Sequence, residues 1–329
     1  MPRPIIAITM GDPAGIGPEV VIKTLSDPEI WRECAPFVVG DVGVMRENAR
    51  ILGAKIAFRP IAKLSEASFA PTEVDVLCPE GAQVERIMWG KVDATMGKAA
   101  MLCLEKAYEL AMRGEVQGVV SAPLNKEAMH LAGYDFMDEL QRLAAFTHSP
   151  DTFILGVTNA VWTITVSEHV PFRQIADRVK KERVLWCITK MHEVLQKVGS
   201  NQGRIAVAAL NVHGGEGGLF GREELDEIGP AIEAARARGM RVEGPIPADT
   251  VFLRALGGEF DGVVAMYHDQ ANIARKLQPR SQAATIFMGL PVVCGTTAHG
   301  TAFDRAGQGT ADPGSLQAAL RYVVRLAKA

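Results

Sequence analysis

Short apolar segments of strand-like composition alternate with helical segments along the whole chain. The segments Phe153–Val157 and Ala160–Val166 are examples of the first kind, whereas Thr95–Arg113 repeats apolar residues at helical spacing. Such alternation is typical of an α/β protein with a mainly parallel sheet. A last apolar run, Ala284–Val293, is expected to form one strand before a glycine-rich loop and a C-terminal helix.

Size, charge and cysteine content narrow the class of protein. The 329 residues are enough for two lobes, and a hydrophobic content of 48% allows a large core. A formal net charge of −3 argues against a nucleic-acid or anionic-membrane surface, and no apolar stretch is long enough to cross a bilayer. The five cysteines are widely spaced and the N-terminus has no signal-peptide pattern, so we expect reduced thiols and a cytoplasmic location.

Three of the seven histidines follow strand-like segments. The segments are Trp162–Ser167, Arg204–Leu210 and Asp261–Met266, and the histidines that follow them are His169, His213 and His268. Because sites in open α/β sheets lie at the carboxyl ends of strands, these side chains are expected to converge. Three imidazoles with one open position suit a catalytic divalent metal. Taken singly, each histidine is more often a hydrogen-bonded structural residue than a ligand.

Two glycine-rich loops are candidate ligand sites. Gly11, Gly15 and Gly17 lie in a turn between a strand and a helix, where free backbone N–H groups can bind an anion. The spacing differs from that of a Rossmann dinucleotide site, and a tight strand-to-helix turn is the simpler explanation. In the second loop, Thr297–Pro313, small residues leave room for a flat ligand such as adenosine. The alternative is a surface loop before the last helix.

These motifs together resemble the 4-hydroxythreonine-4-phosphate dehydrogenase family, within the isocitrate and isopropylmalate dehydrogenase superfold. The matching segments are Gly11–Glu19, His169–Pro171, Asn211–Gly218, Pro247–Thr250, Tyr267–Gln270 and His299–Gly309. The resemblance covers essentially the whole chain and implies a two-lobed α/β/α fold with mainly parallel sheets. Residues 1–125 and 280–329 would form an NAD-binding lobe, and residues 126–279 a central metal-binding and dimerisation lobe.

The resemblance also implies a reaction and its participants. A divalent metal, which is zinc, magnesium, manganese or cobalt, is expected at His169, His213 and His268, in a homodimer whose subunits share the site. NAD or NADP would oxidise the secondary alcohol of a small hydroxy acid, and the β-keto acid formed would lose carbon dioxide. The cofactor-binding positions that the resemblance implies are Gly11, Gly15, Gly17, His299, Gly300, Thr301, Ala302, Asp304 and Gly307.

Candidate catalytic and substrate-binding residues complete the expected site. Lys126 and Asp249 are candidates for proton transfer, with a solvated lysine at a helix start and a helix N-cap as their respective alternatives. The substrate-binding positions that the resemblance implies are Glu139, Lys276, Thr285 and Cys294.

The chain departs from the family pattern where the substrate is expected to bind. The family's histidine–threonine pair is missing from Asp138–Gln141, its asparagine position is Thr285 and its arginine position is Cys294. A cysteine cannot replace an arginine fork on a phosphate, although Arg275 and Arg280 carry positive charge nearby in the sequence. The substrate stays open among 4-phosphohydroxythreonine, a four-carbon sugar-acid 4-phosphate such as threonate or erythronate phosphate, and a carboxylated cis-dihydrodiol. A non-catalytic metal- or nucleotide-binding protein is the alternative of another class.

Overall fold

The computed structural model describes residues 3–136, 138–200, 203–279 and 282–328. The chain divides into two compact units, one of Met1–Phe153 with Ala283–Lys328 and one centred on Ile154–Gln282. The stretch of residues 126–153, which the sequence analysis grouped with the central lobe, lies in the first unit, because its helices pack on the long helix there. Arg280 lies outside the described residues.

The sheet of the first unit is mainly parallel. Its strands are β1 (Ile5–Thr9), β2 (Ala35–Val39), β3 (Ala57–Ile61), β4 (Glu73–Leu77), β5 (Gly118–Ser121), β11 (Ala283–Met288) and β12 (Val293–Thr297). They lie in the order β3-β4-β2-β1-β5-β12-β11, and β11 and β12 are the antiparallel neighbours. The expected single strand Ala284–Val293 is therefore wrong. The chain reverses after Gly289, whose φ of +80° favours a turn.

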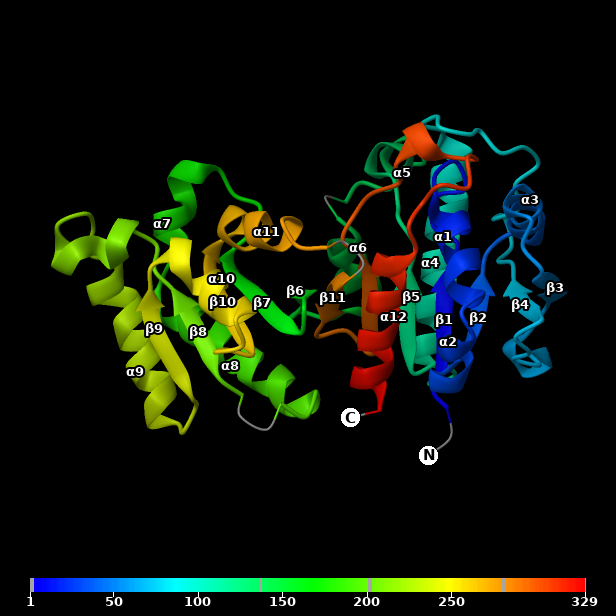
Figure 1. Cartoon of the computed structure of the whole chain (residues 1–329). Coiled ribbons are helices and arrows are strands. Elements are labelled where there is room, and N and C mark those ends of the chain that lie inside the picture. The colour runs from blue at the N-terminus through cyan, green and yellow to red at the C-terminus, as the bar shows by residue number, and fades with distance from the viewer. Residues whose placement is uncertain (1–2, 137, 201–202, 280–281, 329) are drawn as a thin grey trace. The chain divides into compact units, whose positions relative to one another are not determined.

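Helices cover both faces of this sheet (Figure 1). They are α1 (Gly17–Leu25), α2 (Pro28–Glu33), α3 (Val42–Leu52), α4 (Ala94–Met112), α5 (Lys126–Leu131), α6 (Glu139–Thr147) and α12 (Gly314–Ala327). Gly118 and Gly295 face α12, since a Cβ at either would overlap Val323. On the opposite face α4 packs against β1, β2 and β5. The Asp93 carboxylate caps the first turn of α4, so the helix predicted at Thr95–Arg113 is confirmed to within one residue at each end.

The second unit repeats this construction around its own strands. These are β6 (Phe153–Thr158), β7 (Val161–Ser167), β8 (Ile205–Ala208), β9 (Val242–Ile246) and β10 (Gly262–Tyr267). They lie in the order β6-β7-β10-β8-β9. The β6–β7 pair is antiparallel and the other neighbouring strands are parallel. The mainly parallel α/β fold predicted from the sequence is confirmed in both units.

Helices of the second unit also lie on both faces of its sheet. They are α7 (Ile175–Arg178), α8 (Lys181–Lys197), α9 (Gly229–Ala237), α10 (Ala248–Leu256) and α11 (His268–Lys276), with short 3₁₀ or π turns at Phe172–Gln174, Val212–Gly218 and Glu224–Ile228. Gly262 of β10 faces α8, because a Cβ there would overlap Met191. A second core cluster, which includes Phe252, Val263 and Ala271, packs α10 and α11 on the opposite face.

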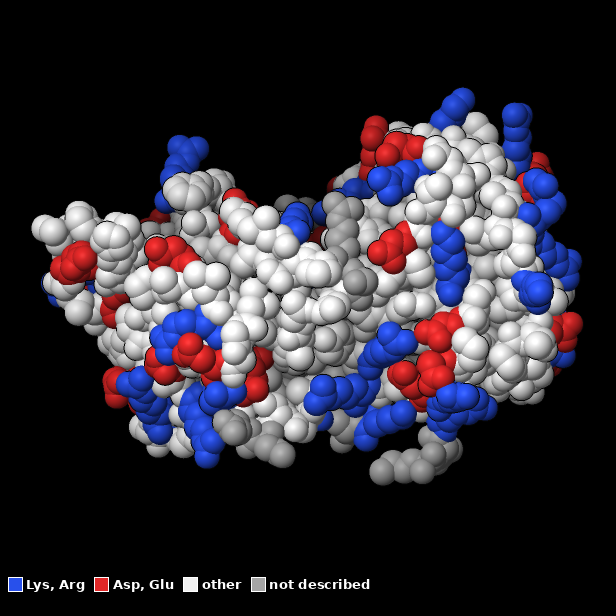
Figure 2. Space-filling model, viewed as in Figure 1, with Lys and Arg blue, Asp and Glu red and all other residues white. Residues whose placement is uncertain are grey.

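The surface charge and the helices of the described residues agree with the near-neutral net charge and the lack of a long apolar stretch in the sequence. Basic and acidic side chains are interspersed over the face shown in Figure 2. In the part of the chain that the structure describes, no helix combines the length and the apolar character that a membrane span requires.

Candidate active site

The three candidate metal ligands follow three neighbouring strands of the second unit. The central strand, β10, pairs in parallel with β7 on one side and with β8 on the other. Their carboxyl ends therefore lie at the same edge of the sheet. His169 follows the end of β7, His268 begins α11 directly after β10, and His213 lies in the turn after β8.

The structure brings two of these histidines together. The ring centroids of His169 and His268 lie 5.8 Å apart and the rings are tilted by 43°. Two imidazoles that share one tetrahedral zinc ion have ring centres about 5 Å apart, given Zn–N distances of about 2.0–2.1 Å. Nδ1 of His268 lies 2.7 Å from Oδ1 of Asp269, a contact that orients the ring and leaves Nε2 for another partner. This pair of nitrogen donors suits a divalent metal.

His213 lies on a left-handed turn. Residues 213–217 all have positive φ, and two of them, His213 at 50° and Glu216 at 44°, are not glycine. Its exposed ring places Nδ1 3.3 Å from Oε1 of Glu216. Within the described ranges, no three His, Cys, Asp or Glu side chains lie close enough together to hold a metal ion. The role of His213 as a third ligand therefore stays a prediction.

Two residues to which the sequence analysis assigned no role hold these turns in place. Glu224, which is 4% exposed, accepts the N–H groups of Leu210 and Asn211 at 2.8 and 2.7 Å. Gln270 donates to the carbonyl of Ala209 at 3.0 Å and so ties the start of α11 to the end of β8. Gln270 belongs to the Tyr-His-Asp-Gln motif, so its role could have been inferred from the sequence. Glu224 lies in a run of acidic residues, and no motif distinguishes it from its neighbours.

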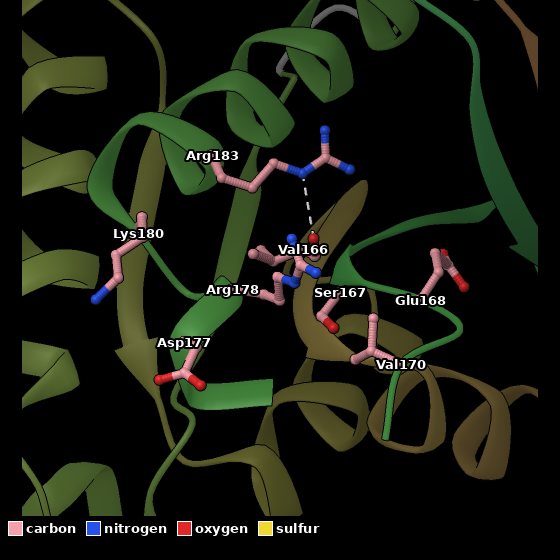
Figure 3. Close-up of a pocket in the computed structure, with 8 residues that line it drawn as sticks. All are labelled: Val166, Ser167, Glu168, Val170, Asp177, Arg178, Lys180 and Arg183. Atoms are coloured by element: carbon pink, nitrogen blue, oxygen red, sulfur yellow. Dashed lines mark hydrogen bonds between the residues drawn. The ribbon is translucent and has the colours of Figure 1, made fainter. Parts of the chain in front are cut away.

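A surface pocket of about 440 Å³ lies at the carboxyl end of β7, and the sequence neighbours of His169 line it. It is lined by Val166, Ser167, Glu168, Val170, Asp177, Arg178, Lys180 and Arg183 (Figure 3). Nε of Arg183 donates to the Val166 carbonyl at 3.1 Å, and Lys180 pairs with Glu227 at 3.1 Å. Figure 3 shows the Lys180 ammonium directed away from Val166. The lining combines three basic with two acidic side chains, and two of the basic ones are already engaged.

The two glycine-rich loops meet in the first unit. The Ile16 N–H donates to the Thr301 carbonyl at 3.0 Å, and a Cβ at Gly15 would lie 2.8 Å from that same oxygen. A Cβ at Gly11 or Gly17 would lie 2.7 or 2.5 Å from other backbone carbonyls. Close backbone packing therefore explains why these three positions are glycine. This agrees with the simpler explanation, a tight strand-to-helix turn. Their contact with a cofactor stays a prediction.

The second loop presents polar groups that a ligand can reach. Asp304 is exposed, and Nδ1 of the half-buried His299 lies 3.0 Å from the carbonyl of the following residue, Gly300. Gly307 has a φ of 73°, and a Cβ there would lie 3.2 Å from the ring of Trp89. Trp89 is a half-buried aromatic residue beside the expected adenosine loop, and it belongs to none of the sequence motifs.

The two proton-transfer candidates lie in different units. Lys126 is exposed in the first turn of α5, behind the Asn125 cap, as a solvated lysine would be. Asp249 is exposed in the first turn of α10. The N-cap of α10 is Pro247, and no side chain caps that helix, so the N-cap alternative for Asp249 is wrong.

Glu139 has the most unusual surroundings of the substrate-binding candidates. Its Oε1 accepts a hydrogen bond from Oγ of Ser121, the last residue of β5, at 2.5 Å. Burial raises the pKa of the Glu139 carboxyl to about 7, against the lowering effect of the Ser121 hydrogen bond, and the charge of Asp138 raises it further. The acid and the carboxylate are therefore both populated near neutral pH.

Cys294, at the position of the family's arginine, is completely buried. On β12 it alternates with Gly295, which faces α12, so its thiol faces α4 and the buried Tyr108. Burial raises the pKa of both the thiol and the phenol. Thr285 lies half-buried on β11 opposite Thr296. In this structure the Cys294 position is closed to a ligand.

The basic candidates of α11 differ in exposure. Lys276 is exposed near the end of the helix. Arg275 donates to Asn272 at 2.9 Å and packs against Gly156, where a Cβ would lie 2.5 Å from its guanidinium. Burial lowers the pKa of Arg275. Arg275 is thus part of the packing of the second unit rather than a cation presented to solvent.

The two α/β units, with paired imidazoles at a sheet edge, define an α/β protein with a candidate metal site. A family model described as pyridoxal phosphate biosynthetic protein PdxA matches residues 32–323, and the chain belongs to that family. The family resemblance inferred from the motifs is thereby confirmed. Members are named as dehydrogenases, so the protein is an oxidoreductase that acts on a CH–OH group.

Curated relatives cover nearly the whole chain. It is 43% identical to D-threonate 4-phosphate dehydrogenase of Salmonella typhimurium, over 98% of each chain. It is 41% identical to the enzyme of the same name from Cupriavidus necator, over 98% of this chain and 97% of the relative.

Solved structures agree with this assignment. A 4-hydroxythreonine-4-phosphate dehydrogenase from Burkholderia phymatum is 36% identical with a TM-score of 0.82, and covers 98% of each chain. A terephthalate 1,2-cis-dihydrodiol dehydrogenase from Burkholderia xenovorans is 28% identical with a TM-score of 0.65, also over 98% of each chain.

Proposed function

We propose that this dehydrogenase oxidises the secondary alcohol of a four-carbon sugar-acid 4-phosphate of the D-threonate 4-phosphate type, with a divalent metal and NAD or NADP. The observation that carries the metal-dependent chemistry is the 5.8 Å pairing of the His169 and His268 rings. The substrate class follows from the relatives of that name, at 43% and 41% identity. A 4-hydroxythreonine 4-phosphate has the same carbon chain length, with an amine in place of one hydroxyl. It is therefore included in the substrate screen described below.

Each group in the site has a defined task in this proposal. His169 and His268 bind the metal, with His213 as the third ligand. When bound, the metal would lower the free energy needed to remove the hydroxyl proton, and the nicotinamide would accept the hydride. Lys126 and Asp249 transfer protons. The β-keto acid that forms then loses carbon dioxide.

The two glycine-rich loops would hold the cofactor. The His299 ring and the Asp304 carboxylate lie on the second loop, where they can bind the polar edge of an adenosine. The first loop would support the second, through the hydrogen bond from the Ile16 N–H to the Thr301 carbonyl.

We also propose a homodimer in which both subunits contribute to the site. Large apolar side chains are exposed close in sequence to each of the three histidines. They include Phe172 (78% exposed), Leu219 (75%) and Leu277 (79%). Apolar side chains around candidate ligands favour coverage by a second copy of the chain, which would remove them from water and enclose the metal. The cytoplasmic location remains our expectation.

A metal-replacement and substrate screen tests the proposed function. Protein stripped of metal receives zinc, magnesium, manganese or cobalt, then NAD or NADP with D-threonate 4-phosphate, 4-hydroxythreonine 4-phosphate or unphosphorylated threonate. We expect reduced nicotinamide and carbon dioxide to form from a phosphorylated substrate, with activity lost on chelation and restored by metal. If no hydroxy acid in the screen is oxidised, a non-catalytic binding protein would be favoured. Activity that survives complete chelation would remove the metal from the reaction.

A carboxylated cis-dihydrodiol is the second candidate substrate. It is favoured by the buried cysteine at position 294, where an arginine grip on phosphate would otherwise be expected. The dihydrodiol dehydrogenase from Burkholderia xenovorans also matches the full chain. Turnover of terephthalate cis-dihydrodiol without turnover of any phosphorylated acid would overturn the first substrate proposal in favour of this one.

A further inference from the structure

Two charged residues of α1 hold the far end of the second glycine-rich loop. Nζ of Lys23 donates to the carbonyls of Gly309 and Ala311 at 2.9 and 2.7 Å. It also donates to Oε1 of Glu19 at 2.7 Å. The same carboxylate oxygen accepts the N–H of Ala311 at 2.7 Å. Glu19 and Lys23, here called the loop anchor, thus join a helix near the start of the chain to a loop near its end.

The loop anchor is buried enough for its partners to matter. Glu19 is 2% exposed, and the Lys23 side chain is 26% exposed. A carboxylate taken out of water needs a counter-charge and hydrogen-bond donors. If the Lys23 ammonium were lost, the Glu19 charge and two backbone carbonyls would lose their donor together. The bonds to Gly309 and Ala311 are therefore coupled to the ion pair.

The near end of the same loop is fixed by the same segment of chain. The carbonyl of Thr301, a buried residue, accepts the Ile16 N–H at 3.0 Å, one turn before Glu19. Residues 302–308 between these attachments are half-buried or exposed and include Asp304 and Gly307. The loop is thus held at both ends by residues 16–23, with its candidate cofactor contacts between the attachments.

We propose that Glu19 and Lys23 are positioning residues that set the affinity for the nicotinamide cofactor by fixing the loop at Gly309 and Ala311. The inference rests on the proposed function, which assigns this loop to the cofactor. The loop anchor acts through the backbone, since its polar atoms are engaged by the loop itself. Without it the loop samples further conformations, and each binding event must first select the competent one. The effect falls on cofactor affinity, and the chemical step is left largely unchanged.

Substitution of Lys23 tests the proposal against a matched control. Lys23→Met removes the donors and keeps the length of the side chain, and Lys23→Arg keeps the charge. Lys106→Met is the control, because Lys106 also pairs with a helical glutamate, at 2.8 Å, and its side chain is 28% exposed. The measurements are hydrogen exchange of residues 301–311 without cofactor, the Kd of the reduced cofactor by fluorescence, the KM and kcat for the oxidised one, and Tm.

For Lys23→Met we expect faster exchange at Ala311 and a Kd and KM raised about tenfold, as for a competent state populated about one-tenth of the time. The kcat should stay within about twofold, Lys23→Arg should recover most of the affinity, and Lys106→Met should change none of these quantities. Glu19→Gln, which keeps the shape but not the charge, should act in the same direction and serves if Lys23→Met does not fold.

Unchanged exchange and unchanged cofactor affinity in Lys23→Met would overturn the inference. A loss of kcat and Tm without a change in cofactor affinity would also overturn it, because that pattern marks a purely structural residue. If the unsubstituted protein binds neither NAD nor NADP, the assignment of the loop in the proposed function fails instead. The exchange measurement needs no cofactor, so it separates that failure from a failure of the loop anchor.

Discussion

The Gln270 side-chain amide donates to the Ala209 carbonyl at 3.0 Å, and this bond joins α11 to the end of β8. Its Oε1 also accepts the Met266 N–H at 2.8 Å, at the end of β10. Gln270 therefore lies between the strand that leads to His268 and the strand that leads to His213. The positions of two candidate ligands depend on one side chain that binds no metal itself.

Replacement of Gln270 by leucine should weaken metal binding without removing a ligand. Residues that orient metal ligands typically change metal affinity by about 10–100-fold when they are lost. We expect Gln270→Leu to fall in that range, measured by competition with a chelator. Gln317→Leu on α12 of the first unit is the control. Equal metal affinity in the two variants would show that Gln270 supports the fold and not the site.

Replacement of His213 by asparagine should abolish turnover and reduce bound metal. Asparagine is chosen because it tolerates the left-handed conformation, with φ of 50°, better than alanine does. The turn should therefore survive, and Tm should change little. Metal content by elemental analysis and the rate of nicotinamide reduction are the measurements. A variant with near-normal metal content and rate would exclude His213 as a ligand.

Much of the arrangement around His169, His213 and His268 was predictable because strand ends in a parallel sheet have few possible positions. The apolar runs before these residues identified the strands, and the sheet order β7-β10-β8 makes them neighbours. The structure brings together His169 and His268. The position of His213 was not predictable, because it depends on the left-handed turn at residues 213–217, whose backbone angles no apolar pattern encodes.

The surroundings of Cys294 and Lys23 were beyond sequence reasoning for a different reason. Whether a strand residue faces a helix or a ligand depends on register, and Cys294 proved to face α4. A glutamate four residues before a lysine indicates an exposed helical pair. The carbonyl partners of Lys23 lie near the other end of the chain, and only the fold reveals them.

Glu139→Gln should make stability less dependent on pH between about 4.5 and 7. The folded-state pKa of Glu139 is about 7, above its ordinary value of 4.5, so the folded state holds this proton more tightly than the unfolded state does. The contribution of this group to the free energy of unfolding is fully present below pH 4.5. It is lost as the pH rises through 7, and the loss reaches about 3 kcal/mol. Glutamine cannot ionise, so the variant should not lose this free energy as the pH rises. Urea unfolding at several pH values measures the difference, with the exposed Glu127→Gln as control. Parallel pH curves for Glu139→Gln and the unsubstituted protein would contradict it.

Cys294→Arg should destabilise the protein rather than create a phosphate site. The new guanidinium would have to fit between β12 and α4 beside the buried Tyr108, where the structure leaves space for a cysteine, and Glu139 is a carboxyl in its neighbourhood. Overpacking a core costs about 1–3 kcal/mol, and burial of the guanidinium adds to that cost. We expect a large fall in Tm and no improved use of phosphorylated acids, whereas Cys294→Ala should cost much less. A stable Cys294→Arg protein with a lower KM for a phosphorylated substrate would show that position 294 does open to the ligand.

Leu277→Asp should dissociate the proposed homodimer and abolish activity in the same step. Leu277 follows α11, which begins at His268 at its other end, and is 79% exposed, so a second copy would remove it from water. A carboxylate there would have to lose its hydration in the interface, which disfavours association. Leu131→Asp is the matched control, because Leu131 is a similarly exposed leucine, at 61%, on α5 of the first unit.

Sedimentation across a dilution series, with activity measured on the same samples, gives both the dimer fraction and the activity. Loss of the dimer and of activity at the same concentration would mean that one chain alone leaves the site incomplete. A monomeric Leu277→Asp protein with full activity would mean that each chain builds its own metal site, and the third ligand would then have to come from the His213 turn of the same subunit.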